Sequence, residues 1–184
     1  MASVREIMTK KVDLEKILDI LSSDEARGHA ISQLVGKVDL SAQQIERAVD
    51  VYENAGRFRD AAATALNAGM NERAVEVYEK AGSFDAAADT ALKAGMNERA
   101  VEDYEKADRF RDAADTALKA GMKERAVEVY EKAGRFDTAA DTALKAGMKE
   151  RAKGLYKRAV EVYEKAGWFR DAADTALKAG MKER

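Results

Sequence analysis

The 184-residue chain has no cysteine, no proline, one histidine and one tryptophan. Without cysteine, disulfides, thiolate metal sites and a cysteine nucleophile are all excluded. A chain that lacks proline and is rich in Ala, Glu, Lys and Leu has a composition that favours α-helix. A lone histidine such as His29 is more often structural or at the surface than catalytic. These absences favour an all-α protein without a catalytic centre.

No apolar run approaches the ~18 residues of a membrane-spanning helix. Residues 1–20 also lack the unbroken apolar stretch of a signal peptide, so we expect a soluble, cytoplasmic protein. Lys and Arg number 32 against 34 Asp and Glu, which gives a formal net charge of -2. Because nucleic-acid-binding proteins normally carry a basic face, we expect no nucleic-acid partner. The Lys- and Glu-rich composition is shared by thermophile proteins and helical repeats, so a thermophilic source stays open.

The chain also lacks a phosphate-binding loop, a nucleophile elbow and a dinucleotide fingerprint. Its carboxylates recur at a fixed spacing, so they spread along the chain and do not converge on a metal. Threonine recurs in the same way, which indicates a scaffold role for Thr64, Thr90, Thr116, Thr142 and Thr175. We therefore expect no enzyme activity, no cofactor and no bound metal.

What the chain does contain is an internal repeat. The pattern Ala-Val-acid-x-Tyr begins at Ala48, Ala74, Ala100, Ala126 and Ala159, so the starts are 26 residues apart three times and then 33 apart. We divide the chain into an N-terminal helical cap (1–40) and a repeat region (41–184). The five repeats are residues 48–73, 74–99, 100–125, 126–151 and 152–184. One unit cannot bury its apolar side alone, so each needs a neighbour.

Each unit has the pattern of two short antiparallel helices joined by a glycine. In the second unit, the spacing of apolar residues predicts helices over 72–81 and 83–94. Asn71 is a good N-cap residue and is predicted to start the first of them. The apolar stripe of the second helix includes Phe84 and Leu92, so positions of both types are predicted to be core.

Two first helices are expected to be longer than the others. Seven residues, 152–158, are inserted ahead of Ala159, and seven residues are close to two helical turns, so a single helix is predicted over 149–166. The capping box at Ser41 predicts a long helix that reaches Ala55. In the cap, N-cap signals predict two further helices that cover the first repeat, at 13–21 and 24–36.

Two residues break the repeat. Asp103 stands where the other units have valine, and because a carboxylate is not buried unpaired, we expect that column to be partly exposed. Asp108 replaces the glycine after a first helix and should weaken that turn, because aspartate enters the left-handed conformation less readily. Such drift favours duplication in a natural gene, although a designed origin stays open.

The last unit resembles the tetratricopeptide repeat in the spacing of Tyr156, Tyr163, Gly167, Phe169, Ala172, Ala176 and Ala179. The shorter units match only in the second helix and in the latter half of the first. The string Tyr-Glu-Lys-Ala-Gly-x-Phe-x-x-Ala-Ala is also similar, more distantly, to the solenoid of the soluble NSF attachment proteins. The resemblance implies an all-α, right-handed α-α superhelix (solenoid) of antiparallel helix pairs that binds protein.

Tetratricopeptide arrays usually bind peptides on a concave side lined by first helices. Carried over by position, that surface shows Glu72, Glu76, Glu79 and Lys80; Glu98, Glu102, Glu105 and Lys106; Glu124, Glu128, Glu131 and Lys132; and Lys157, Glu161, Glu164 and Lys165. Three acids to one base in each short unit predict an acidic groove, which favours a basic protein or peptide and argues against the family's carboxylate-clamp role. The alternative is a solvated helix face in which Glu76 and Lys80 form an ordinary i, i+4 pair.

Trp168 stands at a repeat position that holds Arg or Ser in the other units. It is either a hot spot for a partner or packs over the long helix, and we favour the packing. The sequence stops at residues 181–184, a string that elsewhere opens a first helix. The outward apolar side of the last unit is therefore expected to be exposed or paired. Either the sequence is a fragment of a longer array, or this side self-associates, for example as a homodimer. The sequence thus predicts a protein-binding scaffold, with a self-assembling structural element as the alternative.

Overall fold

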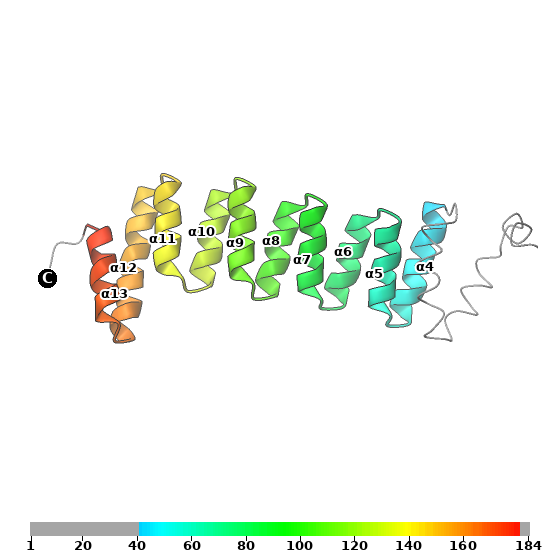
Figure 1. Cartoon of the computed structure of the whole chain (residues 1–184), viewed down its shortest axis with the longest axis horizontal. Helices are drawn as coiled ribbons and strands as arrows, with labels where there is room; N and C mark the ends of the chain where they lie inside the picture. The colour runs from blue at the N-terminus through cyan, green and yellow to red at the C-terminus, as the bar shows by residue number, and fades with distance from the viewer. Residues whose placement is uncertain (1–40, 181–184) are drawn as a thin grey trace, which may run out of the picture. The chain divides into compact units, whose positions relative to one another are not determined.

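The computed structural model describes residues 41–180, which form helices joined by short turns (Figure 1). The helices are α4 (Ala42–Asn54), α5 (Phe58–Asn67), α6 (Asn71–Lys80), α7 (Phe84–Lys93), α8 (Asn97–Lys106), α9 (Phe110–Lys119), α10 (Lys123–Lys132), α11 (Phe136–Lys145), α12 (Lys149–Lys165) and α13 (Phe169–Lys178). This range contains no strand, so the predicted all-α class is confirmed. The predicted cap helices over 13–21 and 24–36, His29 and residues 181–184 lie outside the described residues.

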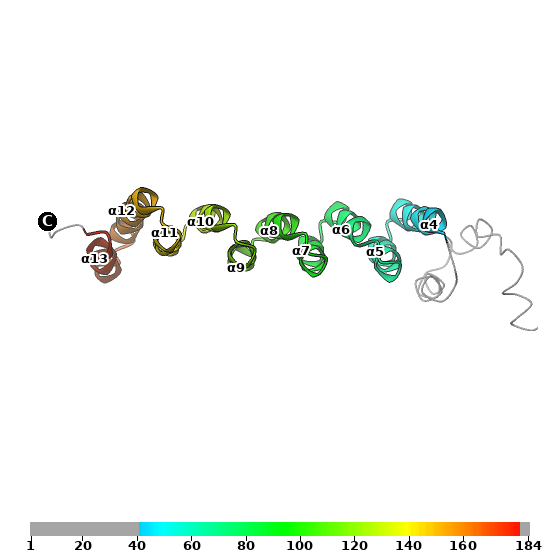
Figure 2. The same ribbon diagram turned by 90° about the horizontal axis from the view of Figure 1, so that it is seen from above.

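The chain divides into two compact units after Ala94, and each unit is built from two layers. In unit 1, the first helices α4 and α6 lie in one layer and the second helices α5 and α7 in the other (Figure 2). In unit 2, the first helices are α8, α10 and α12, and the second helices are α9, α11 and α13. Consecutive helices within a unit pack against each other and run antiparallel. The predicted repeat of antiparallel helix pairs is therefore confirmed within each unit.

Most of the helices begin without a side-chain cap. α4 is the exception, because Ser41 forms the predicted capping box: its Oγ accepts from the N–H of Gln44, and its own N–H donates to Gln44 Oε1 at 3.0 Å. The prediction that Asn71 caps α6 is wrong, since Asn71 is already helical and the N-cap residue is Met70, which makes no side-chain cap bond. Met70 packs against the core of unit 1, so this position is used for apolar burial.

The helices of both units end at residues in the left-handed conformation. After α6, Gly82 has φ +68°, and its N–H bonds to the carbonyl of Glu79 while that of Ser83 bonds to the carbonyl of Tyr78. These bonds satisfy carbonyls that the helix end would otherwise leave without a donor. Asp108 adopts the same conformation with φ +57°, the only residue other than glycine with a positive φ in the described part of the chain. The predicted left-handed turn at Asp108 is thus confirmed.

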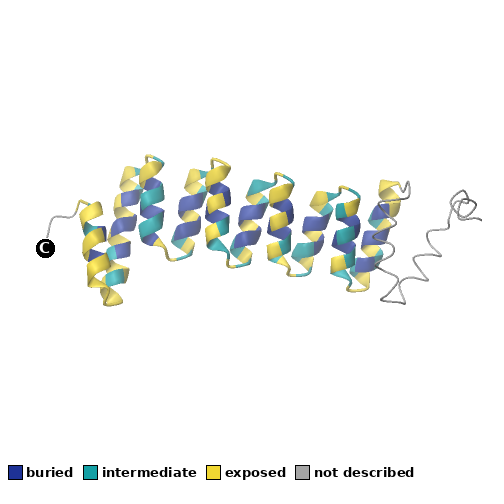
Figure 3. Cartoon of the chain, viewed as in Figure 1, coloured by how far each residue is buried: buried dark blue, intermediate teal, exposed yellow. Residues whose placement is uncertain are grey.

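Alanine and valine form the contact between the layers, as the buried inner faces in Figure 3 show. At the Phe84-type positions, Phe58, Phe84 and Phe110 are partly buried and Phe136 is 8% exposed, but Phe169 is 72% exposed, so the core prediction fails at Phe169. The prediction that Leu92-type positions are core is wrong, because Leu92 is 40% exposed and Leu144 is 48% exposed. Small alanines such as Ala88 let the helices approach closely, so the leucine at the edge of the alanine stripe falls at the rim.

Asp103 on α8 is fully buried, so the expectation that its column is partly exposed is wrong there. Val77 and Val129 occupy the same column and are also fully buried. The Oδ1 atom of Asp103 lies 2.9 Å from Nζ of Lys106, one turn later on the same helix. The expectation failed because a long lysine side chain can reach inward from the surface and compensate a buried carboxylate.

The seven inserted residues lengthen α12 to 17 residues, which confirms the predicted single helix. Leu155 and Tyr156, which the insertion contributes, are buried. α12 runs antiparallel to α11 and continues past the beginning of α11, and α13 starts near the C-terminal end of α12 (Figure 1). The last helix pair of unit 2 is therefore displaced along the helix direction from the pairs before it.

Candidate interaction surfaces

The first helices carry glutamates on their outward side, where a partner-binding surface is predicted. The exposed members are Glu72 and Glu76 in unit 1, and Glu98, Glu102, Glu124, Glu128, Glu161 and Glu164 in unit 2. Glu76 and Glu128 each contact the arginine three residues earlier, at 3.5 and 3.4 Å. The other six have no ion-pair partner among residues 41–180. These six carboxylates are available to a ligand.

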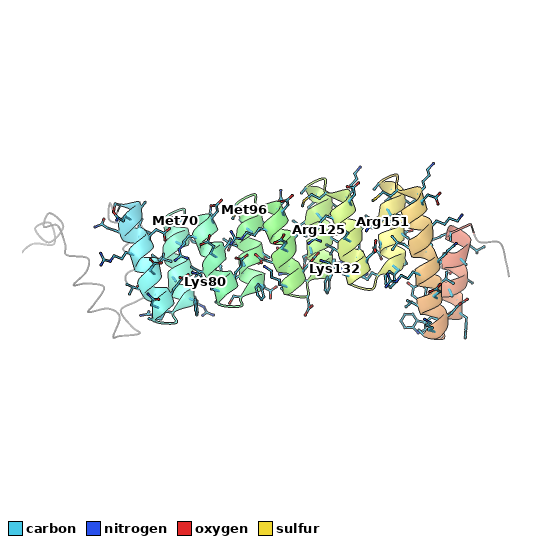
Figure 4. The ribbon with its side chains drawn as sticks, turned by 180° about the vertical axis from the view of Figure 1, so that it is seen from behind. Met70, Lys80, Met96, Arg125, Lys132 and Arg151 are labelled. Carbon is cyan, nitrogen blue, oxygen red and sulfur yellow. The ribbon has the colours of Figure 1, made fainter. Side chains whose placement is uncertain are left out.

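Two more glutamates of the predicted surface, Glu105 and Glu131, are bonded within unit 2. Arg125 and Lys132, both on the following first helix α10, bind Glu105 at 3.1 and 2.7 Å. Arg151 on α12 binds Glu131 at 2.8 Å. Figure 4 shows these three basic residues on α10 and α12. These glutamates therefore link successive first helices, and Glu79, at the same repeat position in unit 1, is half-buried as they are.

Unit 1 contains the most extensive of these links, centred on Arg73 of α6. Its guanidinium contacts Glu46 at 3.0 Å, Asp50 at 2.6 Å and Glu53 at 3.1 Å, all on α4. Lys80 also binds Glu53, at 2.9 Å. Burial alone would raise the pKa of the Glu53 carboxyl, but its bonds to Lys80 and Arg73 lower it below the ordinary value. Burial alone would lower the pKa of Arg73, but Glu53 and Glu46 raise it.

These links between repeats were missed at the sequence level, although the sequence carries a signal for them. Each arginine lies 20 residues after its glutamate: Glu53 and Arg73, Glu105 and Arg125, Glu131 and Arg151. The alternative pairing of Glu76 with Lys80 is also corrected, because Lys80 binds Glu53 on the preceding first helix.

The arginines make the first-helix surface less acidic than predicted. The predicted ratio was three acidic residues to one basic residue in each short unit. Each short unit brings an arginine to the edge of this surface in addition to its lysine, so the ratio becomes three to two. On α12 the balance reverses, because Lys153, Lys157 and Arg158 are all exposed. The acidic part of unit 2 is therefore confined to α8 and α10.

A second candidate surface is the apolar side of α13 in unit 2. Phe169 is 72% exposed and Leu177 is 67% exposed, and Val162 on α12 is exposed as well. Trp168 packs against Tyr163 of the long helix, with ring centroids 5.9 Å apart, yet it remains 58% exposed. Trp168 thus packs against the long helix, as favoured, and among residues 41–180 this apolar side is exposed.

A tyrosine of the long first helix α12 bonds to the second-helix layer. The hydroxyl of Tyr156 on α12 donates to Oδ1 of Asp141 on α11 at 2.5 Å. Burial, together with Asp141, raises the pKa of Tyr156 to about 12. Burial also raises the pKa of Tyr130 on α10, with a further contribution from Asp115 on α9. The hydroxyl of Tyr156 thus links α12 to α11, the second helix that precedes it.

Within residues 41–180, no group of three or more His, Cys, Asp or Glu side chains is placed to hold a metal ion. Over the same range, every helix is too short or too polar to cross a membrane.

Comparison with known proteins returns structural similarities alone: no family model and no curated protein matches the chain. BtubC (BKLC) from P. vanneervenii has 16% identity and a TM-score of 0.28, covering 92% of this chain and 91% of that chain. The de novo designed helical repeat protein DHR64 has 22% identity and a TM-score of 0.23, covering 91% of each chain. The DHF119 filament has 21% identity and a TM-score of 0.22, covering 91% of this chain and 92% of that chain.

At such low TM-scores these similarities bear on neither family, function nor partner. The class follows from the described geometry alone: the chain is a helical repeat protein made of antiparallel helix pairs.

Proposed function

We propose that the chain is a protein-interaction scaffold that binds a basic protein or peptide along the exposed glutamates of its first helices. The observation that carries the proposal is the set Glu98, Glu102 and Glu124 on α8 and α10, all exposed and without an ion-pair partner in the described part of unit 2. A surface that leaves carboxylates unpaired attracts positive charge and speeds the encounter with a basic partner. The proposal assigns the chain binding and no catalytic reaction.

The resemblance to tetratricopeptide repeats supports the same assignment, because that family binds peptides on its first-helix side. Neighbouring glutamates such as Glu105 and Glu131 are already held by Arg125 and Arg151, so they keep the first helices in register. We propose that the ion-paired carboxylates stabilise the scaffold, whereas the exposed, unpaired carboxylates bind the partner.

The test is the affinity of a fluorescein-labelled lysine–alanine peptide, measured by anisotropy at low ionic strength. We expect the double variant Glu102→Lys, Glu124→Lys to weaken binding about five- to tenfold, since each exposed pair contributes about 0.2–1 kcal/mol. The matched control reverses two exposed acids of the other layer, Asp171→Lys and Asp174→Lys, and should bind nearly as the unmodified chain does. Equal losses in both variants would reduce the attraction to net charge and refute a glutamate docking surface.

A second candidate function, self-association as a structural element, is favoured by the exposed apolar side of α13. Side chains such as Phe169 and Leu177 form the kind of patch that marks a protein–protein contact. Light scattering over a range of concentrations tests it. A mass that doubles with concentration and returns to the monomer value in Phe169→Glu would support self-association, and a constant monomer mass would refute it.

A further inference from the structure

Two departures from the repeat lie on the same first helix of unit 2. The ten residues of α8 match those of α6 except at one place, where α8 has Asp103 and α6 has Val77. The turn after α8 differs as well, since Asp108 stands where the turn after α6 has Gly82. In the other described repeats, the corresponding residues are valine and glycine. Both departures therefore fall within residues 103–108, at the C-terminal end of α8 and in its turn.

The first departure places a charge in the contact between helices. Asp103 is 0% exposed, as is Val129 at the same position of α10. A buried carboxylate keeps a cost of desolvation even when an ammonium group lies beside it, as that of Lys106 does at 2.9 Å. A valine at this position has no such cost. The buried face of α8 therefore contributes less stability than the buried face of α10.

The second departure adds a conformational cost at the end of the same helix. Asp108 has φ +57°, whereas the turn after α10 places Gly134 at φ +71°. Both turns close with the same pair of backbone hydrogen bonds, which measure 2.8–3.0 Å. Because the bonds are equivalent, the difference between the turns is the cost of holding a residue other than glycine at a positive φ.

A helical repeat protein is stabilised by its individual repeats and by the contacts between neighbours, so a repeat that carries extra cost opens more readily than the others. Both costs described above fall on α8, which otherwise shares most of its sequence with α6 and α10. We propose that α8 is the segment at which unit 2 opens locally, losing its helical hydrogen bonds for short periods while α10 and α12 stay folded. Two residues thus build a conformational device into one repeat.

The opening of α8 would regulate the glutamate surface, and this consequence rests on the proposed function. Glu98 and Glu102 lie on α8, so they leave their fixed positions when the helix opens. Glu105 also lies on α8 and binds Arg125 and Lys132 of α10 while the helix is folded. Opening therefore removes two exposed carboxylates and frees two basic side chains from Glu105. The folded form of α8 binds a basic partner, and the open form repels it.

Hydrogen–deuterium exchange of single amides, followed by NMR on the full chain, measures local opening. The string Tyr-Glu-Lys ends both α8 and α10, so the amides of Glu105 and Lys106 have nearly the same intrinsic exchange rates as those of Glu131 and Lys132. A difference in measured rate therefore reports a difference in opening. We expect the two α8 amides to exchange about tenfold faster or more. Equal rates in the two helices would overturn the proposal.

An exchange of two residues separates the proposed cause from the position of α8 as the first helix of unit 2. Asp103→Val alone should slow the α8 amides to within about threefold of those in α10. The double variant Asp103→Val, Val129→Asp should move the fast exchange to α10, where Lys132 lies three residues after position 129, as Lys106 does after Asp103. Fast exchange that stays in α8 in either variant would overturn the proposal. Asp108→Gly adds no buried charge and should slow the α8 amides by about threefold; unchanged rates would count against it.

The coupling to binding has a measurement of its own. The lysine–alanine peptide, at about ten times its dissociation constant, should slow exchange at Glu105 and Lys106 about tenfold, since a ligand that binds the folded form stabilises it by mass action. Peptide that binds without slowing the α8 amides would refute the regulation. If no peptide binds, the proposed function fails instead, and the rates in the free chain still decide whether α8 opens.

Discussion

Arg151 on α12 and Glu131 on α10 lie in successive first helices of unit 2, with Nη2 and Oε1 2.8 Å apart. They are separated by 20 residues in the sequence, the same interval as Arg125 and Glu105. A repeated ion pair of this kind fixes the register between one helix pair and the next. The contacts between alanine surfaces specify that register only weakly. Charge on the first helices therefore has a structural role in addition to any role in binding.

The strongest form of this link predicts a large effect at Arg73. Replacing it in Arg73→Met leaves Glu46, Asp50 and Glu53 without their shared cation, and Glu53 is largely buried. We expect the free energy of unfolding to fall by about 1–3 kcal/mol, as for a hydrogen-bonded charge that loses its partner. Urea unfolding followed by circular dichroism measures it. Arg111→Met, at an exposed position, is the control and should change stability by less than about 0.5 kcal/mol.

The lowered pKa of Glu53 predicts a loss of stability in acid. A carboxyl with a folded-state pKa below its unfolded value binds fewer protons when folded. Its contribution is therefore complete above pH 4.5, the ordinary value, and is lost as the pH falls through the lowered value. Glu53→Gln should be less stable than the unmodified chain at pH 7, and the two urea midpoints should converge toward pH 3. A constant difference down to that pH would contradict the assignment.

At Asp108 we expect a substitution to stabilise the chain. Its φ of +57° is a conformation that costs aspartate free energy and glycine almost none. Asp108→Gly should raise the free energy of unfolding by about 0.5–1 kcal/mol. The reciprocal change Gly134→Asp, at the equivalent turn after α10, should lower it by a similar amount. Thermal unfolding of the two variants in parallel tests the pair, and shifts of the same sign would count against the turn as the cause.

The buried carboxylate of Asp103 gives a further prediction. It forms an ion pair with Lys106, whereas the equivalent residues Val77 and Val129 are apolar and need no counter-charge. Replacing a buried ion pair by a well-packed apolar residue is often stabilising, so Asp103→Val should raise the free energy of unfolding by about 1–2 kcal/mol. Lys106→Ala should lower it, because the buried carboxylate then loses the ammonium group that lies 2.9 Å from it. If both variants lose stability equally, Asp103 makes a net favourable contribution that this argument omits.

Features set by neighbouring residues could be predicted from the sequence. The helix bounds, the glycine turns and the single long α12 all depend on local conformation and on a repeat spacing that is visible in the chain. The burial of Asp103 and the exposure of Leu92 could not be predicted in the same way, because they depend on how closely two layers approach. At the candidate surfaces, the sequence identified the exposed glutamates but not the arginines that hold Glu105 and Glu131, since these bonds join helices of different repeats.

The seven-residue insertion in α12 changes the position of the last helix pair but hardly changes its orientation. Seven helical residues rise about 10 Å and stop about 20° short of two full turns. The final helix pair is thus carried outward by that distance while it faces nearly the same way as its predecessors. An insertion of five residues, about 1.4 turns, would instead have rotated the final helix pair onto another side. The long helix consequently behaves as a spacer, and adding or removing two turns would change how far α13 is displaced without changing which residues it presents.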